Sequence, residues 1–241
     1  MLLHITDRDS FLDTFLLPIS KVTDMVVLNI RDKKIDTLVS TSDDAIVSAV
    51  YNDDNIKLNT TLNIPDVTKF CRILQCIDKN EFDLEIGTNN ISYSSQSVRF
   101  KYHFYDDNII PVPKLDLQKI NKLEFNGEFS ITPQSLTSLI KGSTIATESN
   151  KIYISTKGGE MLGELTDNSR ANVDSYGIKL SEDYKGADIT SVPLKFEIFR
   201  IISSMKFNKI EGKLVSSLGV FTFDLSNGNS AIKFIVSALA N

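Results

Sequence analysis

Cysteine and histidine are scarce in this sequence. Its 241 residues include two cysteines, Cys71 and Cys76, and two histidines, His4 and His103. Two cysteines are too few for a disulfide scaffold, and side chains five positions apart on a helix point away from each other. Two histidines this far apart provide no zinc-ligand spacing. We therefore expect reduced thiols in a cytoplasmic compartment, and neither a metal site nor another cofactor.

Long apolar runs and an excess of positive charge are also missing. No run of 18 apolar residues exists, which argues against a transmembrane helix and a membrane partner, and the first ten residues become charged too early for a signal peptide. The 26 Lys and Arg against 31 Asp and Glu give a net charge of −5. This balance excludes a wholly basic nucleic-acid coat, though not a local basic patch. With 41% hydrophobic and 24% charged residues, the chain should form a globular protein of one large domain or two smaller ones.

Motifs of known catalytic sites are absent as well. The sequence contains no GxxxxGK[ST] phosphate loop and no GxSxG nucleophile elbow. Its aspartate pairs, such as Asp43 with Asp44, lie between segments that alternate apolar and polar residues, where solvated turns are expected. The sequence therefore predicts a protein that is not an enzyme.

What the sequence does contain is an internal repeat. The segments 66–79 and 193–206 each have apolar residues at helical spacing. Pro65 and Pro193 are expected at the first helical positions. Counted from these two prolines, the apolar positions of the segments coincide, so the two helices are predicted to be equivalent.

Each of these helices has an earlier companion. A helix is expected over 8–17, after a capping box from Thr6 to Asp9, and another over 133–147. The starts of the paired helices are 58 residues apart in the first half and 60 in the second. Short strands are predicted between and after the helices, at 25–30, 36–40, 46–51, 57–62, 82–86, 91–93 and 98–102, and then at 151–156, 161–165, 173–180, 187–190, 210–215, 221–223 and 232–236.

The predicted fold class is α+β, with two similar halves. Each half would pack two helices on one face of antiparallel sheet, since two helices cannot cover both faces. The segment 105–122 interrupts the repeat with two prolines and paired aspartates, which indicates an extended connector. We therefore expect an N-terminal half over 1–104, a connector over 105–121 and a C-terminal half over 122–241.

This arrangement resembles a DNA polymerase sliding clamp of the proliferating-cell-nuclear-antigen (PCNA) fold, and most closely the clamps of T-even-like phages. The segment 41–50 (TSDDAIVSAV) is similar to the start of the family's third strand, and 62–70 (LNIPDVTKF) to the start of its second helix. The resemblance implies a homotrimeric ring that encircles double-stranded DNA without sequence preference. It also implies that the replicative DNA polymerase and the clamp loader are partners, in the host cytoplasm if the protein is phage-encoded.

In this family an edge strand of one half pairs with an edge strand of the neighbouring subunit, which removes exposed edges. The resemblance implies that these strands are 98–104 and 173–180 here. The expected interface residues are Val98, Phe100, Tyr102, Phe104, Val173, Tyr176, Ile178 and Leu180.

A ring around DNA requires basic helices on an acidic body. The four expected helices together carry +3, so the rest of the chain carries −8. The helix at 8–17 carries −1, which leaves its place in the DNA path open. Each cation could also be an ordinary solvated residue, but loose phosphate attraction without base readout suits a sliding protein. The residues expected to bind DNA are Lys69, Arg72, Lys79, Lys141, Lys195, Arg200 and Lys206.

A clamp without catalysis must work by tethering other proteins. In clamps of this fold the peptide groove lies beside the connector and the C-terminal tail, and the connector here is unusually apolar for an exposed segment. The alternative is that Ile109 and Val112 only pin the connector to the sheet. Short apolar C-terminal peptides of the polymerase and loader are expected in the groove. Its expected residues are Ile46, Ile109, Ile110, Val112, Leu115, Val236, Ala238 and Leu239.

Three alternatives stay open at this stage. The first is a viral processivity factor of the same fold that does not form a ring and holds DNA by charge. The second is a duplicated α+β structural protein that does not bind DNA. The third is a hydrolase with an unrecognised site, against which the missing motifs count.

Overall fold

The computed structural model describes residues 1–147, 149–167 and 172–239. The chain divides into two compact units. The first comprises Met1–Ser42, Ile46–Lys114 and Asn227–Ile232, and the second Asp43–Ala45, Leu115–Ser226 and Lys233–Asn241. No helix in the described ranges is long and apolar enough to cross a membrane.

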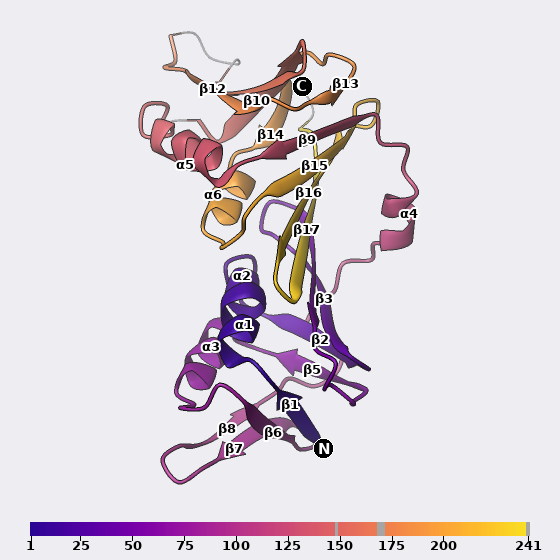
Figure 1. Ribbon diagram of the computed structural model, residues 1–241, viewed down its shortest axis with the longest axis vertical. Coiled ribbons are helices and arrows are strands. Elements are labelled where there is room, and N and C mark those ends of the chain that lie inside the picture. Colours follow the sequence, from indigo (N-terminus) through magenta and orange to yellow (C-terminus); the bar gives the residue numbers. More distant parts are fainter. Residues whose placement is uncertain (148, 168–171, 240–241) are drawn as a thin grey trace. The chain divides into compact units, whose positions relative to one another are not determined.

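The first unit combines antiparallel strands with two helical segments (Figure 1). Strands β4-β3-β2-β5 are hydrogen-bonded in that order, and β1-β6-β7-β8 form a four-stranded sheet. Apolar residues alternate with polar ones along these strands, so that one face of each strand is buried. The elements are β1 (Leu2–Ile5), α1 (Arg8–Ser10), the π-helical η1 (Phe11–Leu16), α2 (Leu17–Ser20), β2 (Val26–Arg31), β3 (Lys34–Ser40), β4 (Ile46–Asn52), β5 (Thr60–Ile64), α3 (Val67–Gln75), β6 (Phe82–Ile86), β7 (Asn90–Ser94) and β8 (Arg99–His103).

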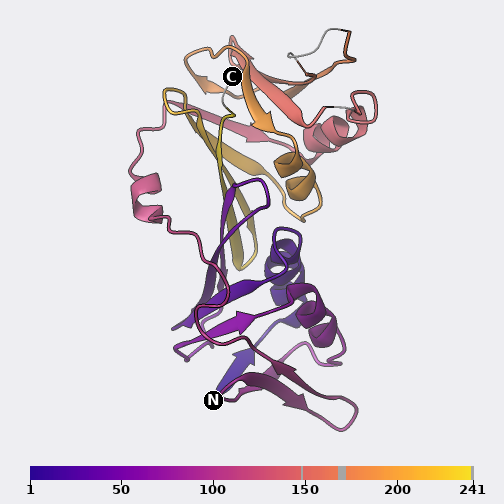
Figure 2. The ribbon, with the colours of Figure 1, turned by 180° about the vertical axis from the view of Figure 1, so that it is seen from behind.

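The second unit repeats this plan (Figure 2). Strands β13-β9-β15-β16-β17 are neighbours in that order, and β12-β11-β10-β14 form a four-stranded sheet. The elements are α4 (Leu117–Asn121), β9 (Gly127–Ile131), α5 (Pro133–Gly142), β10 (Lys151–Lys157), β11 (Glu160–Leu165), β12 (Tyr176–Ser181), β13 (Lys185–Gly186), β14 (Val192–Lys195), α6 (Glu197–Ser203), β15 (Ile210–Val215), β16 (Val220–Asn227) and β17 (Ser230–Ser237).

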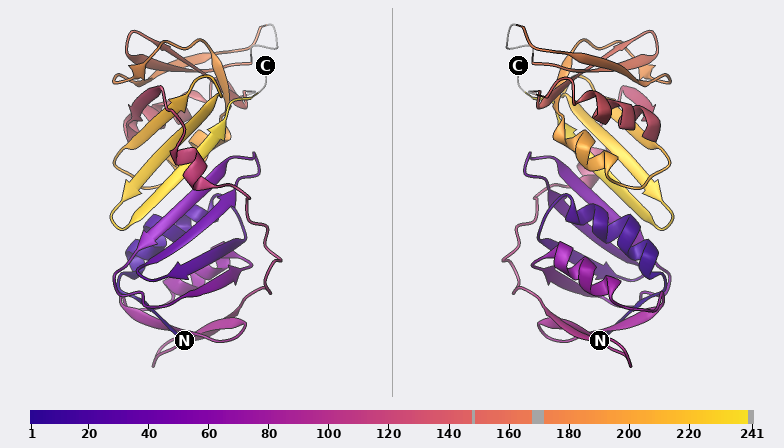
Figure 3. Two further views of the ribbon diagram at one scale, coloured as in Figure 1. Left: turned by 90° about the vertical axis from the view of Figure 1, so that its right-hand side faces the viewer. Right: turned by 90° about the vertical axis from the view of Figure 1, so that its left-hand side faces the viewer.

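Within each unit the two long helical segments pack against each other. Helix α2 contacts α3 in the first unit, and α5 contacts α6 in the second. In each unit both helices lie on the same side of the strands (Figure 3). The predicted fold class, α+β with helices on one face of antiparallel sheet, is therefore confirmed.

The second helix of the second half was predicted to begin too early. Residues Val192–Lys195 form strand β14, in which Pro193 lies opposite Tyr153. Strand β14 ends its sheet, and a proline is tolerated there because an edge strand leaves some N–H groups unused. Helix α6 begins at Glu197, after the Phe196 N–H donates to the Asn150 carbonyl at 2.9 Å.

The start of the first helix also differs from the prediction. Asp7, not Thr6, caps it, with its carboxylate accepting the Ser10 N–H at 2.9 Å. The Thr6 hydroxyl instead donates to Asp53 at 2.7 Å. Helical residues then continue from Arg8 to Ser20 through the π-helical η1. Pro18 follows η1 and supplies no backbone N–H, so the α-helical hydrogen bond to Thr14 cannot form there.

Other boundaries shift for local reasons. Pro65 precedes α3 instead of opening it, because Asp66 is the N-cap and its carboxylate accepts the Lys69 N–H at 2.7 Å. Helix α5 ends at Gly142, five residues before the predicted end. Strand β1, which precedes α1, and strand β9, which precedes α5, were not predicted. The predicted strand at 187–190 is absent from the assigned strands of this described stretch.

Candidate nucleic-acid interface

Helices α3 and α6 are equivalent elements of the two units. Residues 70–74 and 198–202, which are separated by 128 positions, share the same pattern of burial. The N–H of Cys76 caps α3 by donating to the carbonyls of Ile73 and Leu74, and Ser204 does the same at the end of α6. The equivalent buried pairs are Phe70 with Ile198, Cys71 with Phe199, Leu74 with Ile202, Ile77 with Met205 and Phe82 with Ile210.

The exposed face of α3 is basic. Lys69 and Arg72 lie one turn apart on the side opposite the buried stripe, and Lys79 is exposed beyond the helix end. No carboxylate in the described part of the chain lies within ion-pair distance of these three side chains. The carboxylate of Asp66 is occupied as the N-cap of the same helix. This face can therefore attract phosphates without first breaking an ion pair.

The cations around α6 are held by carboxylates. The guanidinium of Arg200 lies 4.7 Å from the centre of the Phe196 ring, and its Nη1 is 3.2 Å from Glu197 Oε2. Lys195 lies on β14, where its Nζ is 3.1 Å from Asp43 Oδ1. These contacts lie within the second unit.

The remaining predicted DNA contacts lie at helix ends. Lys141 is exposed in the last turn of α5, and Lys206 is exposed after α6. In the first helix, Arg8 donates to the Ile77 carbonyl and pairs with Asp9 at 2.8 Å. The charge of Arg8 is thus committed inside its own unit, which agrees with leaving this helix out of the DNA contacts.

Strands β8 and β12 each end a four-stranded sheet. Along β8 the side chains of Phe100 and Tyr102 face inward, while Arg99, Lys101 and His103 are exposed. The Phe104 N–H donates to Asn89 O at 2.9 Å. Hydrogen-bonded pairs alternate along an antiparallel ladder, so the N–H groups of the odd-numbered residues point away from β7. The outer side of β8 is therefore an unpaired edge.

Tyr102 is buried within its own unit. Its hydroxyl donates to the Asp66 carbonyl at 2.8 Å and accepts the Asp66 N–H at 3.0 Å. Burial raises the pKa of Tyr102 to about 12. Tyr102 thus joins β8 to helix α3. A charged substitution at this residue would disrupt the fold before it tested an interface.

The other predicted interface residues differ in exposure. Leu180 is buried, and Tyr176 packs on Gly142 of α5. The partly exposed residues of the predicted set are Val98, Phe100, Phe104, Val173, Tyr176 and Ile178.

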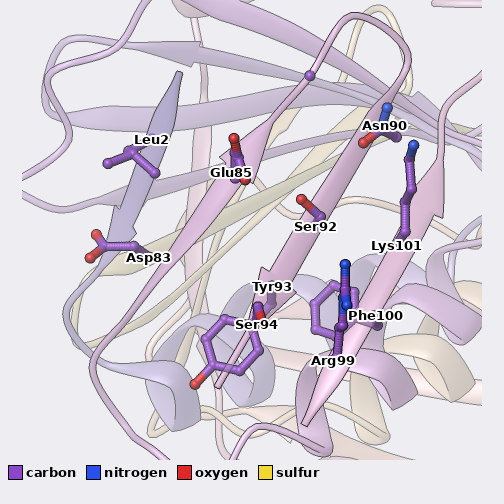
Figure 4. A pocket seen from close by; sticks show the side chains of 11 residues that line it. Leu2, Asp83, Glu85, Asn90, Ser92, Tyr93, Ser94, Arg99, Phe100 and Lys101 are labelled. Carbon is purple, nitrogen blue, oxygen red and sulfur yellow. The ribbon is translucent and has the colours of Figure 1, made fainter. Parts of the chain in front are cut away.

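The outer face of the β1-β6-β7-β8 sheet is hollowed (Figure 4). The hollow has a volume of about 650 Å³. Asp83 and Glu85 line it from β6, and Arg99 and Lys101 from the edge strand β8. The charge thus changes from acidic to basic across the sheet, with the basic side at the unpaired edge.

The connector is anchored in the first unit by polar contacts. The Tyr105 N–H donates to Asn63 O at 3.0 Å, and the Asn63 amide donates to Asp107 at 2.8 Å. Ile110 is buried, whereas the side chains of Ile109 and Val112 are exposed. Ile110 therefore anchors the connector, whereas the apolar side chains of Ile109 and Val112 stay at the surface.

The predicted groove residues are distributed over both units. Ile46, Ile109, Ile110 and Val112 belong to the first, and Leu115, Val236, Ala238 and Leu239 to the second. Val236 is buried. The N–H groups of Ala238 and Leu239 donate to the carbonyls of Gly219 (2.7 Å) and Pro193 (2.9 Å), which fixes the start of the tail in the second unit.

The comparisons with known proteins agree on the fold. PCNA of A. fulgidus, solved with the C-terminal region of FEN-1 bound, superposes with a TM-score of 0.76 at 13% identity, over 100% of this chain and 98% of that one. PCNA of Entamoeba histolytica gives 0.75 at 12%, over 99% and 98%. The chain has the fold of the DNA sliding clamps. The DNA polymerase III β subunit of Thermotoga maritima matches with a TM-score of 0.76 at 11%, over 100% of this chain and 66% of that one. No protein-family model and no curated protein sequence matches the chain.

Two features of this clamp fold were missed by reasoning from sequence. The basic outer row of β8, formed by Arg99, Lys101 and His103, is visible in the alternation of the segment once the strand is known to be an edge. Glu197 beside Arg200 was counted only as part of a net charge. Within the described ranges no group of three or more His, Cys, Asp or Glu residues could hold a metal ion.

Proposed function

We propose that the protein is a sliding clamp, a processivity factor that encircles double-stranded DNA as a homotrimer and tethers the replicative polymerase. The observation that carries this proposal is the likeness to PCNA over nearly the full length of both chains. The similarity thus covers both halves of the chain. The finer proposal is a clamp of the phage type that acts in the host cytoplasm, with halves over 1–104 and 122–241.

Ring closure is supported by the two unpaired edge strands. Strands β8 and β12 belong to different units of one chain, so head-to-tail pairing between copies would join these two edges at every subunit boundary. The partly exposed apolar residues on these strands, such as Phe100 and Ile178, would contribute the buried part of the contact.

Loose binding of DNA is supported by exposed cations on the helix face. Lys69, Arg72, Lys79 and Lys141 are exposed, and they occur on α3, just after it, and on α5. Attraction to phosphates by flexible lysines and arginines is independent of sequence, which sliding requires. Lys195, Arg200 and Lys206 complete the proposed set.

Tethering is supported by the exposed apolar residues of the connector. The C-terminal region of FEN-1 is bound to PCNA of A. fulgidus, which has this fold. We expect Ile109 and Val112 to contact apolar C-terminal peptides of the polymerase and the clamp loader here. Leu239 at the tail is half-buried and would contribute to the same groove.

The mass of the protein in solution, together with polymerase stimulation, tests this proposal. A trimer of 26.9 kDa chains, 3 × 26.9, has a mass of about 81 kDa by light scattering. The variant Leu239→Ser should keep this mass and lose stimulation of the cognate polymerase. A monomer that still stimulates the polymerase would favour the processivity factor that forms no ring. A protein that neither binds DNA nor stimulates synthesis would favour the structural alternative.

A further inference from the structure

At one pair of equivalent positions, the two halves carry opposite charges. With the 128-residue offset between α3 and α6, Arg72 corresponds to Arg200 and Lys69 corresponds to Glu197. The pair on α3 is two cations one turn apart, and the pair on α6 is a cation beside an anion. The burial of residues 70–74 matches that of residues 198–202, whereas Lys69 is exposed and Glu197 is partly exposed.

We propose that Glu197 attenuates phosphate binding by α6, so that DNA is contacted mainly through α3. This inference rests on the proposed clamp function and concerns the relative contributions of α3 and α6 to DNA binding. Arg72 and Arg200 occupy equivalent positions, and the charge of Arg200 is neutralised by the neighbouring Glu197.

The geometry at α6 restrains and neutralises Arg200. The guanidinium is held between the Phe196 ring, at 4.7 Å, and the Glu197 carboxylate, at 3.2 Å. Both charged side chains are about half exposed, so the surrounding water weakens the pair and a phosphate could compete for the arginine. The glutamate would still repel that phosphate at short range, because charges much closer together than the Debye length are only weakly screened by salt.

The neighbouring cation of β14 is neutralised in the same way. Lys195 pairs with Asp43 at 3.1 Å. Both cations at the start of α6 therefore have a carboxylate within ion-pair distance. In α3 one nearby acid is Asp66, whose carboxylate accepts the Lys69 backbone N–H and forms no ion pair with the Lys69 side chain. The other is Asp78, which follows the helix and accepts the Ser97 hydroxyl at 2.7 Å; its equivalent after α6 is Lys206.

Binding of a short fluorescent linear duplex, followed by anisotropy at low salt, tests the inference. Glu197→Gln should tighten binding about threefold and steepen the dependence of log K on log salt by up to about 0.9, the value for one additional phosphate contact. Arg72→Gln should weaken binding about threefold. Arg200→Gln should change it less than twofold in the native chain, but should abolish the gain when combined with Glu197→Gln.

Glu164→Gln is the matched control for net charge. Glu164 is exposed on β11, outside the helix face, and its neutralisation changes the total charge by the same amount. If Glu197→Gln behaves like this control, or Arg200→Gln costs as much as Arg72→Gln, the inference is wrong while duplex binding stands. If neither the wild type nor any variant binds duplex at low salt, the proposed DNA contacts of the helix face are contradicted, and this inference with them. Retention on circular DNA then tests the proposed clamp function separately.

Discussion

At the scale of single residues, Tyr102 connects the edge strand β8 to the beginning of helix α3. Its hydroxyl both donates to and accepts from the backbone of Asp66, which is also the N-cap of that helix. Its ring lies 5.2 Å from that of Phe70. A residue at the proposed subunit boundary is thereby coupled to the helix proposed to contact DNA.

The variant Tyr102→Phe should be less stable by about 1 kcal/mol at pH 7, because it removes the donor to Asp66 and leaves the ring in place. The folded-state pKa of Tyr102 is raised to about 12, so its contribution is complete below the ordinary tyrosine pKa. It is then lost as the pH rises from about 10 toward 12. Urea unfolding at pH 7 and at pH 11 should show a smaller alkaline loss in the variant. An equal loss in both proteins would contradict this role.

A second single-residue contact joins helix α5 to the edge strand β12. Gly142 lies so close to the Tyr176 ring that an added Cβ would come within 1.9 Å of the ring. Gly177, the next residue of β12, has open space where its side chain would be. A larger side chain would thus clash at Gly142 but not at Gly177.

Gly142→Ala should destabilise the protein by about 1–3 kcal/mol, because the Tyr176 ring must move to admit the methyl group. Gly177→Ala should change stability by less than about 0.5 kcal/mol. Thermal unfolding of the two variants makes this comparison. Equal midpoints would mean that the ring does not rest on Gly142.

At the scale of elements, the repeat was predictable because α3 and α6 bury the same positions. The start of α6 was not predictable. The four-residue spacing of Leu194 and Ile198 is compatible with a helix that begins at Pro193 and also with an edge strand that contains Pro193. Only the pairing of β14 with β10 decides between the two. Strand β1 was missed because four residues are too few to show a period.

The candidate site was predictable only in part. The positions of Arg72 and Arg200 follow from the repeat. The contacts that distinguish their surroundings do not, because a net charge count treats Glu197 as one anion among many. The burial of Tyr102 could not be predicted from the sequence of β8 alone, because its hydrogen-bond partner Asp66, at the start of α3, lies 36 residues earlier in the sequence.

The edge of β8 provides a variant that addresses ring closure. Lys101→Pro removes an N–H that points away from β7, so the strand keeps its own ladder. Lys101→Ala removes the same charge and retains the N–H. We expect the proline variant to have the mass of a monomer by light scattering and the alanine variant that of a trimer. A trimeric Lys101→Pro protein would mean that β8 does not pair between subunits.

At the scale of the whole molecule, the proposal requires that the protein hold DNA by enclosing it. The net charge of −5 does not favour tight binding to DNA. Exposed cations such as Lys69, Arg72 and Lys141 give only a loose, salt-sensitive attraction. Lasting association must then come from enclosure of the DNA by the closed ring. Enclosure does not depend on attraction between charges, so salt weakens it less than it weakens the phosphate contacts.

Retention on circular and linear DNA tests this central claim most directly. The protein is incubated with a nicked circular plasmid, together with its clamp loader, and passed through a gel-filtration column at high salt before and after a single restriction cut. We predict that the protein elutes with the circle and is released when the circle is cut, because a ring can slide off an open end. Equal retention on both forms, or none on the circle, would contradict the sliding-clamp account.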